Sequence, residues 1–315
     1  MTDHGTIRVA TLDDIPAAAR VRAAALPDII VTPEAMLRWH TGMPEDCGLL
    51  MLVAEVDGTV VGWATARRLW ERREAGVGMA DVVVHPDHQG RGLGGRLAER
   101  VRDHLAGLGP VSVRASSTET PAAMTLTRRY DMVEIGGERL SAVDPRTVTV
   151  LPVPEDVRLV LFRELPDPRP LYELDLEVSR DIPGDDGIDG WSLEDWSRQF
   201  WQTTMCDPDL SLVAYVDGQV AAMTMLRFDA PSGRAMNALT GTRSAYRGRG
   251  LARLLKSHSL HLAGRAGATL AITSNEDRNA PMLAVNRSLG YQPYSRRVEW
   301  EWRADQESGI SADTA

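Results

Sequence analysis

One stretch of the sequence occurs twice and decides the fold. It reads VVVHPDHQGRGLG at residues 82–94 and TGTRSAYRGRGLA at residues 240–252. In each copy a run rich in β-branched residues leads into a glycine-rich turn, and leucines at helical spacing follow. The pattern predicts a strand, a tight turn and the start of a helix. Such a turn gathers unpaired backbone N–H groups and the positive end of the helix dipole at one point, which favours a phosphate group.

A second segment is repeated ahead of each glycine turn. LVAEVDG at residues 52–58 returns as LVAYVDG at residues 212–218, and an apolar run follows each copy. Apolar runs on both sides of Asp-Gly are typical of a β-hairpin. The two signals recur in the same order after about 150 to 160 residues, a period too long for a solenoid and indicative of duplicated domains.

The repeat sets the domain boundaries that we expect. The first domain spans residues 1–143 and the second spans residues 157–303. Residues 144–156 contain three prolines and lack helical periodicity, so we expect a short ordered linker there. Residues 304–315 are small and polar, and we expect them to be disordered.

The composition excludes several classes of protein. A net charge of -9 and a pI near 5.3 disfavour nucleic acid and anionic membrane surfaces as partners. Two cysteines are too few for a disulfide framework or a four-cysteine metal site, and no apolar run reaches membrane length. We therefore expect a cytoplasmic protein without metal, membrane or nucleic-acid partners. Its only lysine is Lys256.

Two other kinds of phosphate site share the glycine turn. A P-loop requires Lys and then Ser or Thr after its last glycine, but Gly94 and Ala252 are followed by Gly-Arg and Arg-Leu. Gly90, Gly92 and Gly95 do satisfy the dinucleotide fingerprint. That fingerprint belongs after the first strand of its domain, whereas a hairpin and two helical stretches come first here, and the second copy lacks the third glycine.

Both copies share one further pattern, namely Gln or Arg, two residues, Gly, one residue, and Gly or Ala. It resembles the acyl-CoA pyrophosphate loop of the GNAT superfamily, and the resemblance covers residues 6–142 and 157–303. It implies an α/β (α+β) fold with two tandem GNAT-like domains, each a mixed, mostly antiparallel sheet flanked by helices. The residues that it assigns to the coenzyme loop are Gln89, Gly90, Arg91, Gly92, Leu93, Gly94, Arg247, Gly248, Arg249, Gly250, Leu251 and Ala252.

The second half matches the superfamily in one more place. TSN at residues 273–275 and the stretch from Asn279 to Tyr291 look like a fifth strand and the helix after it. The resemblance assigns Asn279 to the pantetheine arm, and we count Asn286 with the coenzyme-binding residues. The first half has no asparagine at the corresponding place, so the second half, which has both the glycine loop and the Asn279 helix, is favoured as the competent site. The complete glycine loop of the first half predicts that it also holds a CoA.

The resemblance implies direct acetyl transfer from acetyl-CoA without an acyl-enzyme. The pantetheine arm would pair beside the fourth strand at Val82 and Val84, or at Thr240 and Thr242, and a backbone N–H there would polarise the thioester carbonyl. The usual glutamate base and tyrosine acid have no counterpart in this sequence, so ordered water is the default proton carrier.

A few side chains remain candidates for the proton transfers and for the acceptor. Asp81 and Tyr291 are the catalytic candidates that we retain, with Glu74 as a nearby replacement. Trp70 and Trp201 could stack on an acceptor.

Two hypotheses of function follow. The favoured one is an acyl-CoA-dependent N-acetyltransferase acting on a primary amine of a small molecule, as a monomer or a weak homodimer. Its tandem organisation resembles two-domain bacterial GNAT proteins of the mycothiol synthase type. The alternative is an acyl-CoA-binding or sensing protein in which one or both domains have lost turnover. A nicotinamide oxidoreductase is a distant third hypothesis.

Overall fold

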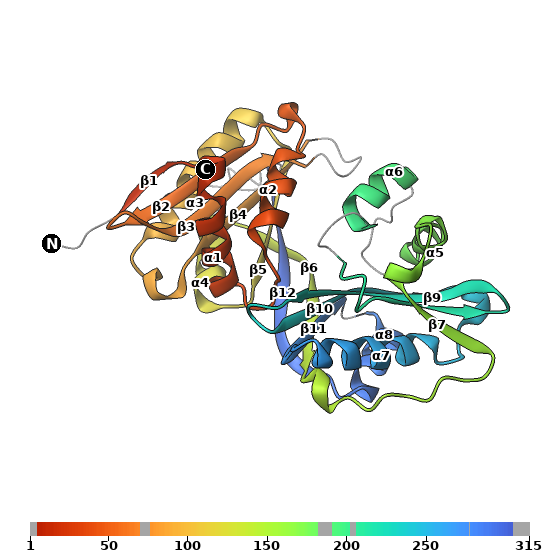
Figure 1. The fold of residues 1–315 in the computed structure, drawn as a ribbon. Helices are drawn as coiled ribbons and strands as arrows, with labels where there is room; N and C mark the ends of the chain where they lie inside the picture. The colour runs from red at the N-terminus through yellow and green to blue at the C-terminus, as the bar shows by residue number, and fades with distance from the viewer. Residues whose placement is uncertain (1–4, 70–75, 182–190, 202–205, 277, 305–315) are drawn as a thin grey trace, which may run out of the picture. The chain divides into compact units, whose positions relative to one another are not determined.

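The computed structural model describes residues 5–69, 76–181, 191–201, 206–276 and 278–304 (Figure 1). The chain forms two compact units. The first unit comprises Met1–Gly137 and Arg296–Ala315, and the second comprises Glu138–Ser295. The end of the chain that we expect to be disordered lies outside the described residues from position 305 onward.

The first unit contains one mixed sheet with the strand order β1-β2-β3-β4-β5-β12. Only β4 and β5 are parallel, and the other neighbours are antiparallel. The elements are β1 (Thr6–Val9), α1 (Ile15–Ala25), α2 (Pro33–Thr41), β2 (Leu50–Val56), β3 (Thr59–Arg68), β4 (Val77–Val84), α3 (Leu93–Leu108), β5 (Ser112–Thr118), α4 (Pro121–Arg129) and β12 (Gln292–Arg303).

The second unit repeats this plan with the order β7-β8-β9-β10-β11-β6, and here β10 and β11 are the parallel pair. The predicted fold, a mixed and mostly antiparallel sheet flanked by helices, is therefore confirmed in both units. The elements are β6 (Val133–Val143), β7 (Val157–Leu161), α5 (Arg169–Ser179), α6 (Leu193–Trp196), β8 (Leu212–Val216), β9 (Gln219–Asp229), β10 (Arg234–Thr242), α7 (Leu251–Arg265), β11 (Leu270–Glu276) and α8 (Ala280–Ser288).

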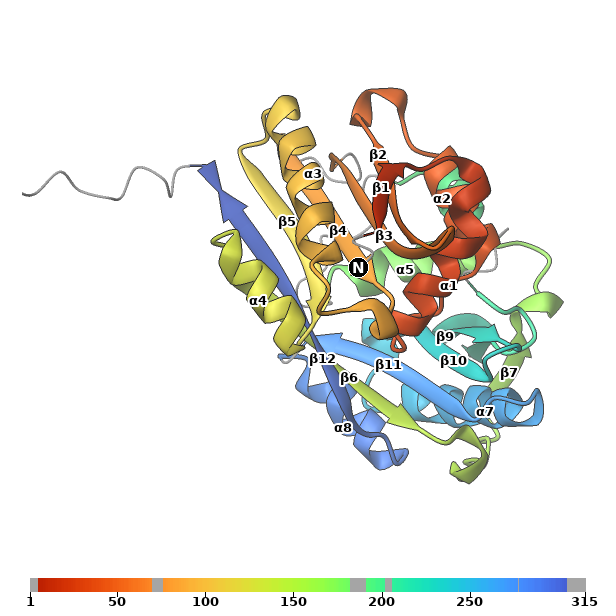
Figure 2. The ribbon, with the colours of Figure 1, turned by 90° about the vertical axis from the view of Figure 1, so that its left-hand side faces the viewer.

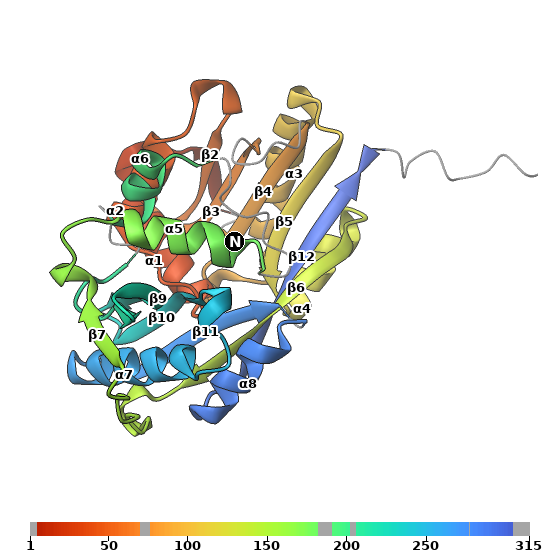
Figure 3. The ribbon, with the colours of Figure 1, turned by 90° about the vertical axis from the view of Figure 1, so that its right-hand side faces the viewer.

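In each unit the strand next to the parallel pair comes from the other half of the sequence. β12, near the end of the chain, pairs with β5 from Arg297↔Thr118 to Arg303↔Ser112 (Figures 2 and 3). β6, which follows the first repeat, pairs with β11 in the second unit. The compact units therefore differ from the domains that we expect at 1–143 and 157–303. Local sequence patterns define a strand but not its partner, and the two final strands have exchanged partners.

The segment expected to be a linker, residues 144–156, is ordered and belongs to the second unit. The Leu151 amide donates to Ser257 Oγ of α7 at 3.3 Å, and the Leu151 carbonyl lies 2.9 Å from His258 Nε2. Val148 is buried in the core of the second unit. This segment therefore packs along α7 instead of spanning free space.

Helices cover both faces of each sheet, and successive side chains along a strand point to opposite faces and pack with different helices. In β2, Leu52 and Ala54 pack with α3, whereas Val53 faces the cluster formed by α1 and α2. In the second unit, β9 and β10 run between α5 and α6 on one side and α7 and α8 on the other (Figure 1). Both hairpins turn at Asp-Gly, with positive φ at Asp57, Gly58, Asp217 and Gly218, so the predicted hairpins are confirmed.

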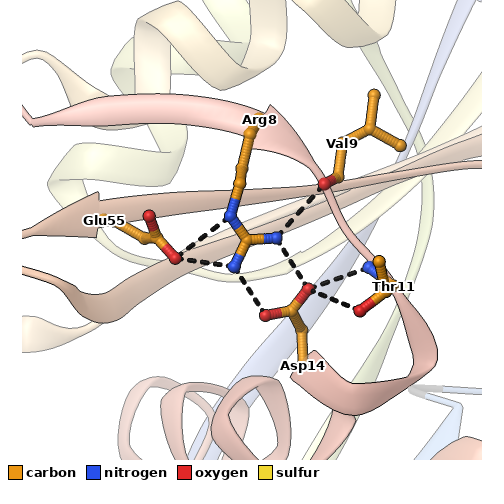
Figure 4. Close-up of polar contacts among 5 residues, drawn as sticks. All are labelled: Arg8, Val9, Thr11, Asp14 and Glu55. Atoms are coloured by element: carbon orange, nitrogen blue, oxygen red, sulfur yellow. Dashed lines mark hydrogen bonds and ion pairs between the residues drawn. The ribbon is translucent and has the colours of Figure 1, made fainter.

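Arg8 ties the edge strand β1 to its neighbours (Figure 4). Its guanidinium binds both oxygens of Asp14, at 2.7 and 2.8 Å, and Glu55 Oε1 of β2 at 2.6 Å. Asp14 also accepts the Thr11 amide at 2.8 Å. The hydrogen bonds from Arg8 hold the pKa of the Asp14 carboxyl below its ordinary value. This cluster fixes the turn between β1 and α1 on the exposed side of the unit.

Trp300→Ala tests the exchange of strands. Trp300 is 5% exposed, and its indole Nε1 donates to Ser117 Oγ of β5 at 2.9 Å. We expect a loss of roughly 3 to 5 kcal/mol of stability. Hydrogen exchange should show the β5 amides losing protection. Glu299→Ala, an exposed neighbour on the same strand, should stay within about 0.5 kcal/mol of wild type. Loss of protection in β11 with β5 unchanged would contradict the observed pairing.

Candidate functional site

The two glycine loops have the same backbone conformation. Gly90 and Gly92 have φ values of 74° and 81°, and Gly248 and Gly250 have 78° and 75°. This left-handed region favours glycine. A Cβ at any of the four positions would meet no atom within 4 Å, so the space beside each loop is open. Glycine is required here by the positive φ of the backbone and not by a lack of space. The open space leaves room for a ligand.

Each loop presents unpaired amides at the start of a helix. Gly92 and Gly250 are the N-cap residues of α3 and α7, and neither helix has a side-chain cap. The first intrahelical bonds join Arg96 N to Gly92 O and Leu254 N to Gly250 O. The amides of residues 93–95 and 251–253 therefore have no intrahelical partner. Free donors, helix dipole and open space together fit a pyrophosphate group.

The first residue of the loop pattern binds the end of the preceding strand in both units. Gln89 Nε2 donates to the Val84 carbonyl at 3.0 Å, and Arg247 Nε donates to the Thr242 carbonyl at 3.2 Å. The loop is therefore fastened to β4 or β10. This contact gives a physical reason for a long side chain with an N–H donor at that position.

The fourth strand of each unit has an open edge next to its loop. Pairing between β4 and β5 ends at Ala80↔Ala115. In the antiparallel pair of β3 and β4, every second residue of β4 bonds to β3, and the bond from His85 N to Val61 O shows which residues these are. Val82 and Val84 are at the positions between them, so their backbone N–H and C=O groups point away from β3. Within the described part of the first unit, no strand pairs with β4 beyond Ala80 on that side.

The fourth strand of the second unit, β10, has the same open edge. Pairing between β10 and β11 ends at Asn237↔Thr273, and Arg243 N bonds to Ala221 O of β9. Thr240 and Thr242 consequently point their backbone groups away from β9. These residues lie on the strand that leads into the Gly248–Ala252 loop, and their pairing with the pantetheine arm stays a prediction.

The second unit also contains a buried polar network that the sequence analysis did not single out. Lys256 Nζ donates to Asn237 Oδ1 at 3.0 Å, and Thr240 Oγ1 donates to the same oxygen at 3.0 Å. Asn237 Nδ2 in turn donates to Thr224 Oγ1 at 2.9 Å and to the Met225 carbonyl at 3.0 Å. The only available sequence signal was a lone lysine among the leucines of α7.

Burial dominates the chemistry of Lys256. The side chain is 1% exposed, and burial lowers its pKa to about 7. The Tyr291 ring lies 5.1 Å from Nζ and favours the charged amine. No carboxylate among the described residues forms an ion pair with Nζ, so burial prevails. Burial therefore shifts the Lys256 amine toward its neutral form.

Asp81, a predicted catalytic residue, is held by an ion pair. Its carboxylate binds Arg22 of α1, with both side chains partly buried. His40 lies in the same region, with its Nδ1 2.7 Å from the Met36 carbonyl and its ring edge-on to Trp63. Burial lowers the pKa of His40. Arg22 binds one of the two carboxylate oxygens, Oδ2, and the role of Asp81 as a general base stays a prediction.

Tyr291 and the two predicted asparagines lie around α8. Tyr291 is 2% exposed, its hydroxyl has no partner among the described residues, and burial raises its pKa. Asn279 caps α8 by accepting the Met282 amide at 3.2 Å. Asn286 Nδ2 donates to Asn275 Oδ1 of β11 at 2.6 Å. These contacts are structural, and the roles in catalysis and coenzyme binding stay predictions.

The remaining candidates contribute less. His85 and His88 stack edge-on, and no group of three potential metal ligands occurs in the part of the chain that the structure describes. Trp201 packs against Phe162 in the core of the second unit. Trp70 and Glu74 lie outside the described residues. Among the described helices, none has the length and hydropathy needed to cross a membrane.

Comparisons with known proteins agree with this geometry. The model of the acetyltransferase (GNAT) family matches residues 22–124 and again residues 171–291. A mycothiol acetyltransferase of Acidothermus cellulolyticus is 25% identical over 282 residues, which cover 83% of this chain and 82% of that protein. Another, from Thermobispora bispora, is 29% identical over 223 residues, or 67% and 71% of the two chains.

Two solved structures share the tandem fold over nearly the whole chain. A GCN5-related N-acetyltransferase from Sphaerobacter thermophilus has a TM-score of 0.68 at 23% identity and covers 96% of both chains. A tandem GNAT protein from the clavulanic acid biosynthesis pathway has a TM-score of 0.70 at 22% identity, covering 95% of this chain and 98% of that one.

Lys256→Met should remove a pH dependence of stability. Between about pH 7 and 10.5 the unfolded chain keeps a proton on Lys256 that the folded chain has lost. The free energy of unfolding of wild type should therefore rise with pH in this window, by at most about 1.4 kcal/mol per pH unit from this group. Below pH 7 both states are protonated, and the contribution is constant. Urea denaturation at pH 7, 8 and 9 should show a smaller rise for the variant. Equal slopes would contradict the lowered pKa.

Proposed function

We propose a reaction for this chain from one premise: the chain belongs to the acetyltransferase (GNAT) family and is an N-acetyltransferase enzyme. The donor that we propose is acetyl-CoA, and the acceptor is a primary amine of a small molecule. The observation that carries this proposal is the joining of two features in each unit. A loop with free amides and open space follows directly on a strand whose next edge has no partner strand among the described residues.

In this proposal, different backbone groups of each unit bind the pyrophosphate, pair with the pantetheine arm and polarise the thioester. The amides of residues 93–95 or 251–253 would hold the pyrophosphate, and the open edge at Val82 or Thr240 would pair with the pantetheine arm. A backbone N–H of that edge would donate to the thioester carbonyl oxygen, where negative charge develops as the amine attacks. The amine nitrogen bonds to the carbonyl carbon, and the carbon–sulfur bond then breaks, so that CoA leaves as a thiolate. We propose that ordered water carries the amine proton to this thiolate, which gives the N-acetylated amine and free CoA.

A second candidate function applies to the first unit. Arg22 binds one oxygen of Asp81, the carboxylate that the sequence offers as a base there. The glycine loop of the same unit keeps its left-handed glycines and free amides. We therefore propose that the first unit binds acyl-CoA without turning it over.

Gly92→Glu and Gly250→Glu test coenzyme binding in each unit. Each substitution places a bulky anion where the pyrophosphate should lie. We expect isothermal titration with acetyl-CoA to show the affinity of the altered unit falling at least about tenfold, because the phosphate site is blocked and made repulsive. Absence of binding by wild type would overturn the proposed donor.

The hairpin glycines provide matched controls for backbone strain. Gly58 and Gly218 have φ values of 73° and 77°, and a Cβ at either position meets no atom within 4 Å. Gly58→Glu and Gly218→Glu carry similar strain and the same charge, but they lie in the hairpin turns. We expect them to leave acetyl-CoA affinity unchanged. A comparable loss of affinity in these controls would show that strain, not the phosphate site, explains the loop variants.

An amine panel tests turnover. Wild type with acetyl-CoA and glucosamine, amino acid amides or deacetylated mycothiol should yield an N-acetylated product detected by mass spectrometry. We include the last amine because the relatives above are named mycothiol acetyltransferase. Gly250→Glu should reduce product formation more strongly than Gly92→Glu. Binding of acetyl-CoA without product from any amine would favour the sensing alternative for the whole chain.

A further inference from the structure

The buried network of the second unit, Thr224, Asn237, Thr240 and Lys256, surrounds an irregularity in β10. The register of β10 against β9 shifts between Asn237 and Leu239, so the strand carries a β-bulge there. Asn237 lies before the bulge and Thr240 after it, and the hydrogen bond from Thr240 Oγ1 to Asn237 Oδ1 bridges the bulge at 3.0 Å. Thr224 of β9 binds both, at 2.9 and 2.8 Å. Lys256 adds the contact from α7.

All hydrogen-bonding groups of the Asn237 amide are occupied by this network. Its oxygen accepts from Lys256 and Thr240, and its nitrogen donates to Thr224 and to the Met225 carbonyl. A buried amide with every group satisfied has one favourable orientation. The network therefore fixes the backbone on both sides of the bulge, at the point where pairing with β11 ends.

The first unit has apolar residues at the matching positions. Ala80 matches Asn237, because each is the last residue of the fourth strand to pair with the fifth. Ala98 matches Lys256, because each lies six residues after the second glycine of its loop. The register of β3 with β4 continues without a shift from Gly62↔Val84 to Arg68↔Gly78.

The two threonines of the network are replaced in the same way. Thr240 pairs with Thr224 across β10 and β9, and the matching pair of the first unit is Val82 with Ala64. These residues join the apolar cluster beneath α3. The fold therefore forms with an apolar interior at this place, and the buried lysine of the second unit is not needed to build it.

The geometry points to Lys256 as a positioning residue of the acetyl-transfer site in the second unit. Through Asn237 it holds the bulged backbone of β10, so that the Thr240 amide faces the thioester carbonyl of the donor. Lys256 acts through Asn237 and does not touch the donor. This inference rests on the proposed function and adds to it the buried residues that position the transfer site of the second unit.

The free-energy cost of the network supports a role beyond folding. Burying an amine without a carboxylate partner is unfavourable, and the matching alanine in the first unit avoids that cost. A buried polar set at one site of a duplicated fold, where the matching site is apolar, is characteristic of functional positions.

Lys256→Met tests the inference with the amine that gives the highest turnover in the panel. We expect kcat to fall at least about tenfold while KM for acetyl-CoA changes less than about threefold, because the phosphate loop is untouched and only the transition-state contact is misplaced. Ser259→Ala is the matched control on the same helix. Ser259 is buried and donates to the Leu210 carbonyl at 2.6 Å, outside the network, so its loss should lower the melting temperature and leave kcat unchanged.

A quadruple variant separates function from folding. Thr224→Ala, Asn237→Ala, Thr240→Val and Lys256→Ala together give the second unit the residues of the first. We expect this variant to melt at or above the temperature of wild type and to bind acetyl-CoA. Its kcat should be as low as that of Lys256→Met. Turnover by wild type with an unchanged kcat in Lys256→Met and in the quadruple variant would overturn this inference alone. Absence of turnover by wild type would overturn the proposed function and the inference together.

Discussion

The parallel pairing of the fourth and fifth strands ends early in both units, and the other features of the site depend on this. In each unit the pairing joins four residues of one strand to four of the other. Beyond that point the fourth strand keeps the antiparallel bonds on one side and offers its backbone on the other. The glycine turn then begins a helix at the end of that strand. The early end of the parallel pairing thus places an open strand edge and the glycine loop side by side.

The two units keep this backbone plan but differ in what lies beneath it. The loops agree closely in conformation, and each is fastened to its strand by Gln89 or Arg247. Beneath the strand, one unit has an apolar layer and the other has a lysine, an asparagine and two threonines. The residues of the loop can vary little because its left-handed positions favour glycine. The side chains beneath the strand can be apolar or polar, provided that buried polar groups have hydrogen-bond partners.

Local sequence patterns predict the helices, strands and turns, but they do not predict contacts between residues far apart in the sequence. The Asp-Gly hairpins, the glycine turns and the amphipathic α3 follow from residues close together in the sequence, and all are confirmed. The partners of β6 and β12 depend on pairing between distant segments, which no local pattern encodes. The pairing of Arg22 with Asp81 and of Lys256 with Asn237 also joins different elements. Asp81 can be picked out from the sequence, but its ion pair with the Arg22 guanidinium depends on the packing of α1 against β4.

The exchange of final strands has a consequence for synthesis on the ribosome. β5 ends at Thr118, and its partner β12 becomes available only after Arg303 has been added. At usual elongation rates this interval lasts roughly 10 to 40 s. During that time the edge of β5 is open, and β6 is the strand that emerges next. β6 must therefore remain unpaired until β11 has been translated. The order of synthesis favours a non-native pairing of β6 with the open edge of β5 before the native partners are available.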